Sequence, residues 1–225
     1  MNKIHQFHYT NQSKSTLIKE PDLKEQIKQF RNSAYFPLRL IHYILKPFWS
    51  IRRFFTDAHF RAALITGLKF NKGYHQRSAF TKMDRYPVVF AACARYLNNY
   101  AQPKILSFGC STGEEVASIG DYIPTAVVSG VDINEWCITQ CKKKYAGGNF
   151  SFYHRNAAEF TNAGDFDAIF CMAVFQHTEN RLGKDNATAR GFTFEQFEAE
   201  LMMLDKKLKP GGLLVIDNTD FNFES

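Results

Sequence analysis

Short apolar runs alternate with amphipathic segments along the second half of the chain. The apolar runs predict strands at 105–108, 126–131, 150–153, 167–171 and 213–216. The amphipathic segments between them predict helices at 114–122, 135–145 and 194–208, the last one ended by the sequence KPGG at 209–212. Regular alternation of strand and helix builds a doubly wound parallel sheet with right-handed crossovers. We therefore expect an α/β domain over residues 101–225.

The first hundred residues have a different pattern. Residues 1–20 are polar and aperiodic, which predicts a tail without regular structure. Residues 21–100 predict a basic, aromatic-rich helical extension, which ends in an apolar helix at 88–100 just before the first strand. Within it, Pro37 and Pro47 are expected to divide the stretch 34–70 into short helices.

Charge is distributed unevenly along the 225 residues, whose net charge is +6. Residues 1–100 hold 17 Lys and Arg against 5 Asp and Glu, whereas residues 101–225 hold 11 against 17. A basic, aromatic-rich amphipathic stretch at 34–70 fits an anionic membrane surface, or a helical cap that packs on the acidic half of the chain. Nucleic acid is a weaker hypothesis, because no recognisable RNA-binding module is present.

The cysteines and the first residues indicate the compartment. The five cysteines form no CxxC pair and no His/Cys cluster with zinc spacing, so no metal site is predicted. The first residues lack the apolar core of a signal peptide, and no apolar run approaches the ~20 residues of a membrane span. We expect a cytoplasmic protein that is at most peripheral to a membrane.

The stretch Lys104–Glu115, KILSFGCSTGEE, combines an apolar run, a small-residue turn and a helix start. In an α/β fold this combination forms a nucleotide site, because glycines allow close approach of the backbone and the helix start offers unpaired N–H groups. Asp132 follows Gly113 by nineteen residues and ends the next apolar run. An acid at about that distance (~20 residues) binds the ribose hydroxyls in dinucleotide-binding folds.

These residues resemble the class I S-adenosylmethionine-dependent methyltransferases, whose first motif reads LDxGCGTG. The string CSTGEE is similar to the variant in chemotaxis-receptor methyltransferases, and FTKMDRYP at 80–87 is similar to a segment of uncharacterised methyltransferase-domain proteins. The resemblance covers residues 104–217. It implies a Rossmann-like sheet that either lacks the last two strands of the superfamily or has that edge covered in another way.

The resemblance also implies a cofactor and a reaction. The cofactor would be S-adenosyl-L-methionine, converted to S-adenosyl-L-homocysteine as the methyl group passes to an oxygen or nitrogen of an acceptor. The acceptor would be a small molecule or a lipid- or glycan-linked group. His177, at the end of a segment similar to FDxVxxxxVLxH, would be the general base, since imidazole titrates near neutrality. Alternatively, His177 caps the following helix or packs behind the cofactor.

Two further groups of residues take roles from the resemblance. The segment before the first strand would fold over the cofactor as a lid, through His75, Gln76, Arg77, Arg85 and Tyr86. The cofactor itself would contact Phe108, Gly109, Cys110, Ser111, Gly113, Asp132, Ile133, Asn156, Ala157, Cys171 and Met172.

Two alternatives stay open at this stage. The sequence GCSTG also satisfies GxSxG, the nucleophile elbow of α/β-hydrolases, with Ser111 as nucleophile and Asp167 and His177 as partners. Against it, no HGGG-like oxyanion loop precedes the turn. The second alternative is an inactive cofactor-binding or partner-docking module, because Ser107 stands where the superfamily carries an acid.

Overall fold

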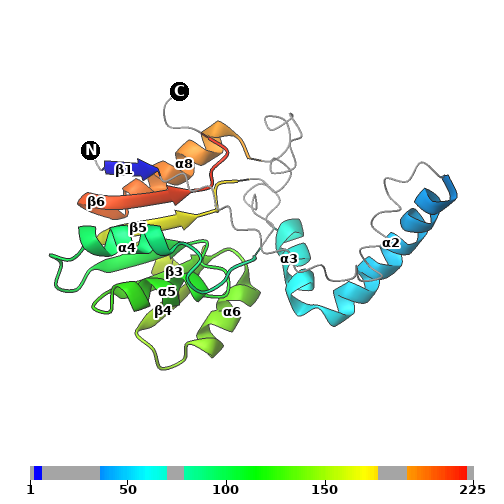
Figure 1. The fold of residues 1–225 in the computed structure, drawn as a ribbon, viewed down its shortest axis with the longest axis horizontal. Coiled ribbons are helices and arrows are strands. Elements are labelled where there is room, and N and C mark those ends of the chain that lie inside the picture. Colours follow the sequence, from blue (N-terminus) through cyan, green and yellow to red (C-terminus); the bar gives the residue numbers. More distant parts are fainter. Residues whose placement is uncertain (1–2, 7–35, 70–78, 177–191, 222–225) are drawn as a thin grey trace. The chain divides into compact units, whose positions relative to one another are not determined.

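Six strands form one parallel sheet in the computed structural model, which describes residues 3–6, 36–69, 79–176 and 192–221 (Figure 1). Their order across the sheet is β1-β6-β5-β2-β3-β4, and every neighbouring pair is parallel. The strands are β1 (Lys3–Gln6), β2 (Lys104–Phe108), β3 (Val127–Asp132), β4 (Phe150–His154), β5 (Phe166–Met172) and β6 (Leu208–Asp217). This order confirms the predicted doubly wound α/β fold.

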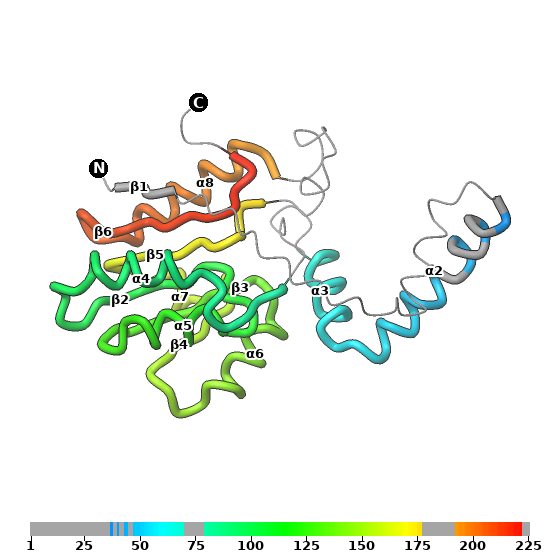
Figure 2. The backbone as a smooth tube through the Cα atoms, viewed as in Figure 1, coloured from blue at the N-terminus to red at the C-terminus, as the bar shows by residue number. Residues whose placement is uncertain are grey.

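The helices of the described residues are α2 (Phe36–Thr56), α3 (Ala58–Lys69), α4 (Pro87–Tyr96), α5 (Glu114–Tyr122), α6 (Glu135–Lys144), α7 (Ala158–Asn162) and α8 (Phe194–Asp205). The backbone runs from β2 through α5 to β3 and on through α6 to β4 (Figure 2). The predicted strands and crossover helices therefore lie where the hydrophobic pattern indicated. Helix α8 ends at Asp205, three residues earlier than predicted.

Two local predictions were wrong. Helix α2 continues through Pro47, with Pro37 in its first turn, where a proline N–H would have no helical partner in any case. An isolated proline removes one hydrogen bond from a long helix, and α2 tolerates that loss. Strand β6 includes the KPGG sequence predicted as a turn, because Leu208 pairs with Phe166 before an irregularity in the register.

Strand β1 corrects the prediction that residues 1–20 form a tail without regular structure. Its residues pair with β6 in the register Lys3↔Leu213 to Gln6↔Ile216. An edge strand such as β6 exposes a row of backbone donors and acceptors, on which another strand can pair. The outer edge that the sequence analysis left without its last two strands is therefore covered by the start of the chain. The rest of residues 1–20 lies outside the described residues.

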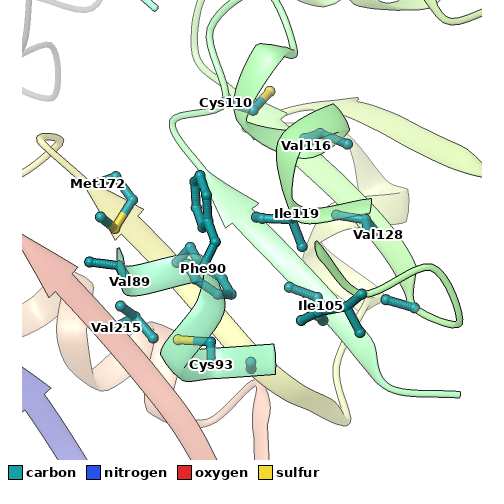
Figure 3. Packing of buried hydrophobic residues seen from close by; sticks show 14 of the residues in the cluster. Val89, Phe90, Cys93, Ile105, Cys110, Val116, Ile119, Val128, Met172 and Val215 are labelled. Carbon is teal, nitrogen blue, oxygen red and sulfur yellow. The ribbon is translucent and has the colours of Figure 1, made fainter. Parts of the chain in front are cut away.

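Two hydrophobic clusters cover the two faces of the sheet. Neighbouring residues of β2 divide between them: Ile105 belongs to the cluster beneath α4, α5 and α6, and Leu106 to the cluster beneath α7 and α8. Figure 3 shows the first cluster, in which α4 inserts Phe90 between the strands and α5. The Phe90 ring lies 6.0 Å from the Phe170 ring and 5.7 Å from the Tyr122 ring. Helix α4 is therefore part of this core.

Contacts divide the chain into two compact units, residues 9–61 and residues 1–8 with 62–225. The sheet and helices α4 to α8 all belong to the second unit. The predicted boundaries at residues 20 and 100 stay predictions. Among the helices of the described ranges, none is both long and apolar enough to span a bilayer.

One buried lysine fastens α7 to the start of β6. Lys207 Nζ donates to the carbonyl oxygens of Phe160 at 2.8 Å, Thr161 at 3.0 Å and Ala163 at 2.7 Å. These carbonyls belong to the C-terminal turn of α7, where acceptors have no helical partner. Burial, and then the charge of Arg155, lower the pKa of the Lys207 ammonium group. Its three hydrogen bonds hold the end of the helix against the sheet.

Replacing this lysine should destabilise the fold. We expect Lys207→Met to lower the free energy of unfolding by about 2–4 kcal/mol, because one buried and two partly buried hydrogen bonds from a charged donor are lost. Urea denaturation measures this change. The exposed neighbour Lys206 supplies the matched control, and Lys206→Met should stay within about 0.5 kcal/mol of the parent. Equal effects of the two substitutions would show that the lysine does not anchor α7.

Candidate functional site

The glycine turn lies beside the carboxyl end of β3. Three of its residues have left-handed backbone conformations, with φ of 80° at Gly109, 51° at Ser111 and 92° at Gly113. The backbone N–H groups of Gly109 and Cys110 both donate to Val131 O, at 2.8 and 3.0 Å. The turn therefore stands at the edge where open α/β sheets bind ligands, against the strand that ends in the predicted ribose acid.

Asp132 is bound to the glycine turn directly. Its Oδ2 accepts the N–H of Ser111 at 2.9 Å, and its Oδ1 accepts the N–H of Asn134 at 2.8 Å. Burial raises the pKa of the Asp132 carboxyl, although these backbone hydrogen bonds act in the opposite direction. Among the described residues, no Lys or Arg forms an ion pair with it.

This arrangement fits the ribose of the expected cofactor. A carboxylate oxygen has two lone pairs, and each oxygen of Asp132 uses one for a backbone N–H. Two carboxylate oxygens side by side suit the two adjacent hydroxyl groups of a ribose. Hydrogen bonds to a carboxylate stabilise it most where it is shielded from water, because they replace the hydration that it has lost.

The sequence analysis missed a second acid in the site. Ser107 Oγ, at the end of β2, donates to Glu115 Oε1 at 2.8 Å. Burial raises the pKa of the Glu115 carboxyl to about 8; the hydrogen bond from Ser107 and the charge of Arg85 lower it, and the charge of Asp217 raises it. The carboxyl group that position 107 lacks is therefore present beside it, on Glu115 in the first turn of α5. The sequence offered a signal in the adjacent acids Glu114 and Glu115. In the structure the Glu115 side chain reaches Ser107 on β2.

A buried tyrosine lies within the electrostatic reach of this acid. Tyr86 Oη is buried without a well-formed hydrogen bond among the described residues, and the side chain of Asn218 lies near it. Burial raises the pKa of Tyr86 to about 12; the charge of Arg85 lowers it, and the charges of Asp217 and Glu115 raise it. A buried hydroxyl without a partner is uncommon, and at such a site it is a group that a polar ligand can satisfy.

The segment that precedes α4 is attached to the glycine turn and to α5. Ser111 Oγ donates to Ala79 O at 2.7 Å, and Ser118 Oγ accepts the N–H of Asp84 at 2.8 Å. Tyr122 Oη donates to Asp84 Oδ1 at 2.9 Å. Two predicted lid residues, Arg85 and Tyr86, thus lie next to the site.

Arg85 is held within that segment. Its guanidinium donates to Phe80 O at 3.1 Å and lies 5.6 Å from the centre of the Phe80 ring. The other predicted lid residues, His75, Gln76 and Arg77, lie outside the described residues.

Several predicted cofactor contacts have side chains that belong to the core. Cys110 and Cys171 are buried, and burial raises the pKa of both thiols. Figure 3 shows Cys110 and Met172 among the residues of the first cluster. Phe108 packs in the second cluster, with its ring 6.3 Å from that of Phe160. These residues shape the site from beneath, and their contact with a cofactor stays a prediction.

The loops after β3 and β4 lie side by side. His154 Nε2 lies 2.9 Å from Ile133 O, and the N–H of Asn156 donates to His154 Nδ1 at 3.2 Å. Since Nδ1 accepts, the proton is assigned to Nε2, which donates to the carbonyl. The exposed Asn156 and the adjacent Ala157, at the start of α7, therefore neighbour Ile133. Their role with adenine stays a prediction.

The hydrolase alternative is contradicted by the position of its acid. Asp167 lies at the amino end of β5, where Oδ2 accepts the N–H of Lys104 at 2.8 Å and Oδ1 pairs with Lys209 at 2.7 Å. Ser111 follows the opposite, carboxyl end of β2. Because the strands are parallel, the two side chains belong to opposite edges of the sheet and cannot share a histidine.

The predicted general base and the predicted absence of a metal site both stay predictions. His177 lies outside the described residues, so its role as general base stays a prediction. Within the described ranges, no group of three or more His, Cys, Asp or Glu side chains is placed to hold a metal ion.

A protein-family model described as "Methyltransferase domain" matches residues 105–189. This stretch begins in β2, contains the glycine turn, Asp132 and Asn156, and extends past β5. An uncharacterised protein of Synechococcus sp. is 26% identical over 136 residues, which are 58% of this chain and 29% of that protein.

Solved structures of methyltransferases are also similar to the chain. A methyltransferase from Thiobacillus denitrificans, in complex with S-adenosyl-L-homocysteine, shares 20% identity and a TM-score of 0.39 over 68% of this chain and 54% of its own. CalS10, an amino pentose methyltransferase from Micromonospora echinaspora, shares 20% identity and a TM-score of 0.42 over 57% of this chain and 48% of its own. The chain spans less than two thirds of each of these proteins.

Proposed function

We propose that this chain, whose residues 105–189 match the methyltransferase-domain model, is a class I S-adenosylmethionine-dependent methyltransferase that transfers the methyl group to an oxygen or nitrogen of an acceptor. The acceptor class that we propose is a small molecule or a lipid- or glycan-linked group. One observation carries the proposal: the Asp132 carboxylate at the end of β3 accepts the N–H of Ser111 in the glycine turn at 2.9 Å.

The site residues have separate tasks in this proposal. S-adenosylmethionine supplies a methyl group already activated on a sulfonium centre, so the protein mainly binds, orients and excludes water. Asp132 would accept the ribose hydroxyls, and the backbone of Gly109 and Gly113 would allow close approach of the cofactor. The Glu115 carboxyl, bound to Ser107 Oγ, would face the amino-acid end of the cofactor, and the cationic amino group there would favour its ionised form.

Glu115 also weakens the argument for an inactive module. That alternative drew support from Ser107, which stands where the superfamily carries an acid. Because Glu115 Oε1 lies 2.8 Å from Ser107 Oγ, a carboxyl group is present beside that position after all. We therefore favour an active methyltransferase, with the inactive module as the outcome that a transfer assay must exclude.

The proposal is tested by binding and transfer on the full chain. Isothermal titration should show S-adenosylmethionine binding at one site, and cofactor labelled in the methyl group should deliver label to a fraction of a metabolite or lipid extract. If His177 is the base, His177→Ala should leave the Kd unchanged and slow transfer by about 10²–10⁴-fold. Binding without transfer to any fraction would favour the inactive module, and absence of binding would contradict the proposal.

A further inference from the structure

Helix α2 exposes a continuous apolar stripe. Besides Tyr43, five large apolar side chains are exposed along it and form the stripe: Leu40 by 47%, Ile44 by 62%, Phe48 by 64%, Ile51 by 59% and Phe55 by 74%. At about 100° per residue these positions fall within an arc of roughly 80° on the helix surface. Scattered apolar residues are normal on protein surfaces, but an ordered row over four turns marks an interaction surface.

The charge of the same helix is of one sign. Its 21 residues include Arg39, Lys46, Arg52 and Arg53 and no Asp or Glu. Of these four, Arg52 and Arg53 are exposed near the C-terminal end of the helix. Arg53 Nε pairs with Asp57 at 3.0 Å, directly after the helix, whereas no carboxylate of the described residues pairs with the exposed Arg52. A partner of α2 must therefore accept both apolar side chains and positive charge.

The end of α2 is fixed to the start of α3. Asp57 Oδ1 accepts the N–H of Phe60 at 2.9 Å, and Arg61 Nη1 donates to Phe54 O at 3.0 Å. The Arg53 guanidinium also lies 4.5 Å from the centre of the Phe60 ring. A helix held in this way presents its face already formed, which lowers the conformational entropy lost when it binds.

We propose that α2 binds the surface of a lipid bilayer that carries anionic phospholipid headgroups. The stripe from Leu40 to Phe55 enters the boundary between headgroups and acyl chains, and the basic residues meet the headgroup phosphates and carboxylates. A basic helix of this kind, with apolar and charged sides, lies in the plane of the interface and does not cross the bilayer. Because it uses none of the residues assigned to the cofactor, this proposal does not rest on the proposed methyl transfer.

Vesicle flotation with the full chain tests the proposal. The parent should float with vesicles of phosphatidylcholine that contain about one quarter phosphatidylserine, at least about tenfold more tightly than with phosphatidylcholine alone. High salt should remove that preference, because the charges lie at the exposed interface. Arg52→Gln should reduce binding to the anionic vesicles about fivefold.

A double variant and a matched control separate the apolar contribution. Ile44→Glu/Phe48→Glu should lower partitioning by at least about a hundredfold, since both side chains leave the acyl boundary and two negative charges enter. Met202→Glu, on α8, replaces an equally exposed apolar residue (59%) by the same charge and should bind vesicles like the parent. Circular dichroism spectra that match the parent would show that the variants are folded.

The other outcomes would overturn the proposal. If the parent floats with neither vesicle and the double variant lowers the melting temperature, α2 is a cap that packs on its own chain. If the parent floats with neither vesicle and the double variant instead dissociates an oligomer, the stripe faces a second copy. Equal binding of parent and double variant to anionic vesicles would show that another part of the chain binds lipid.

Discussion

Replacing Asp132 by alanine should weaken S-adenosylmethionine binding by about 2–4 kcal/mol, a roughly 30- to 1,000-fold rise in Kd. Asp132 is half-buried, and its two oxygens are the acceptors that we assign to the ribose hydroxyls. Alanine removes both acceptor oxygens. The two ribose hydroxyls then lose their hydrogen-bond partners in a site that is partly shielded from water. Isothermal titration of parent and variant measures the difference.

Two further variants make this result specific. Asp132→Asn keeps one oxygen acceptor in the same place, so its Kd should fall between those of the parent and the alanine variant. Asp121→Ala removes an exposed carboxylate from α5 and should leave the Kd unchanged. Because Asp132 also accepts the N–H groups of Ser111 and Asn134, thermal unfolding must show that the site is still folded. A Kd unchanged in Asp132→Ala would remove the ribose assignment.

The second large effect is a pH dependence of stability at Glu115. Burial raises the pKa of its carboxyl from 4.5 to about 8, so the folded state favours the protonated form. The contribution of Glu115 to the free energy of unfolding is fully present below about pH 4.5, and it is lost as the pH rises towards 8. Between pH 5 and pH 8 the free energy of unfolding of the parent should therefore fall by about 2–4 kcal/mol more than that of Glu115→Gln.

The adjacent acid is the control for this measurement. Burial acts to raise the pKa of Glu114, but hydrogen bonds from Lys144 and Thr112 outweigh it, and the pKa is lowered. Glu114 is thus ionised throughout pH 5 to 8, so Glu114→Gln should not alter the slope over this range. Urea denaturation at several pH values gives the slopes. Parallel curves for parent and Glu115→Gln would show that Glu115 is ionised in the folded protein.

The central strands of the sheet could be predicted from the sequence because they are buried on both faces. Residues 105–106 of β2 and 168–171 of β5 are apolar at consecutive positions, as strands beneath two layers of helices must be. The position of Asp132 beside the glycine turn followed from the same pattern, since neighbouring parallel strands end at the same edge. That geometry was predicted, and the Ser111–Asp132 hydrogen bond confirms the proximity.

Other features depend on contacts that no local pattern records. Strand β1 has four residues with one aliphatic side chain, Ile4, so only its pairing with β6 identifies it. The pair of Ser107 and Glu115 joins a strand to the following helix, and the sequence analysis judged Ser107 by itself. The hydrolase alternative failed for a similar reason, because the side of the sheet on which Asp167 lies follows from strand direction and not from motif spacing.

The central claim is that the glycine turn and Asp132 hold the cofactor. A crystal structure of the full chain with S-adenosyl-L-homocysteine tests it most directly. We expect both ribose hydroxyls within hydrogen-bond distance of the Asp132 carboxylate, and the amino-acid end near Glu115. A nucleoside bound elsewhere, or one whose ribose makes no contact with Asp132, would contradict the assignment.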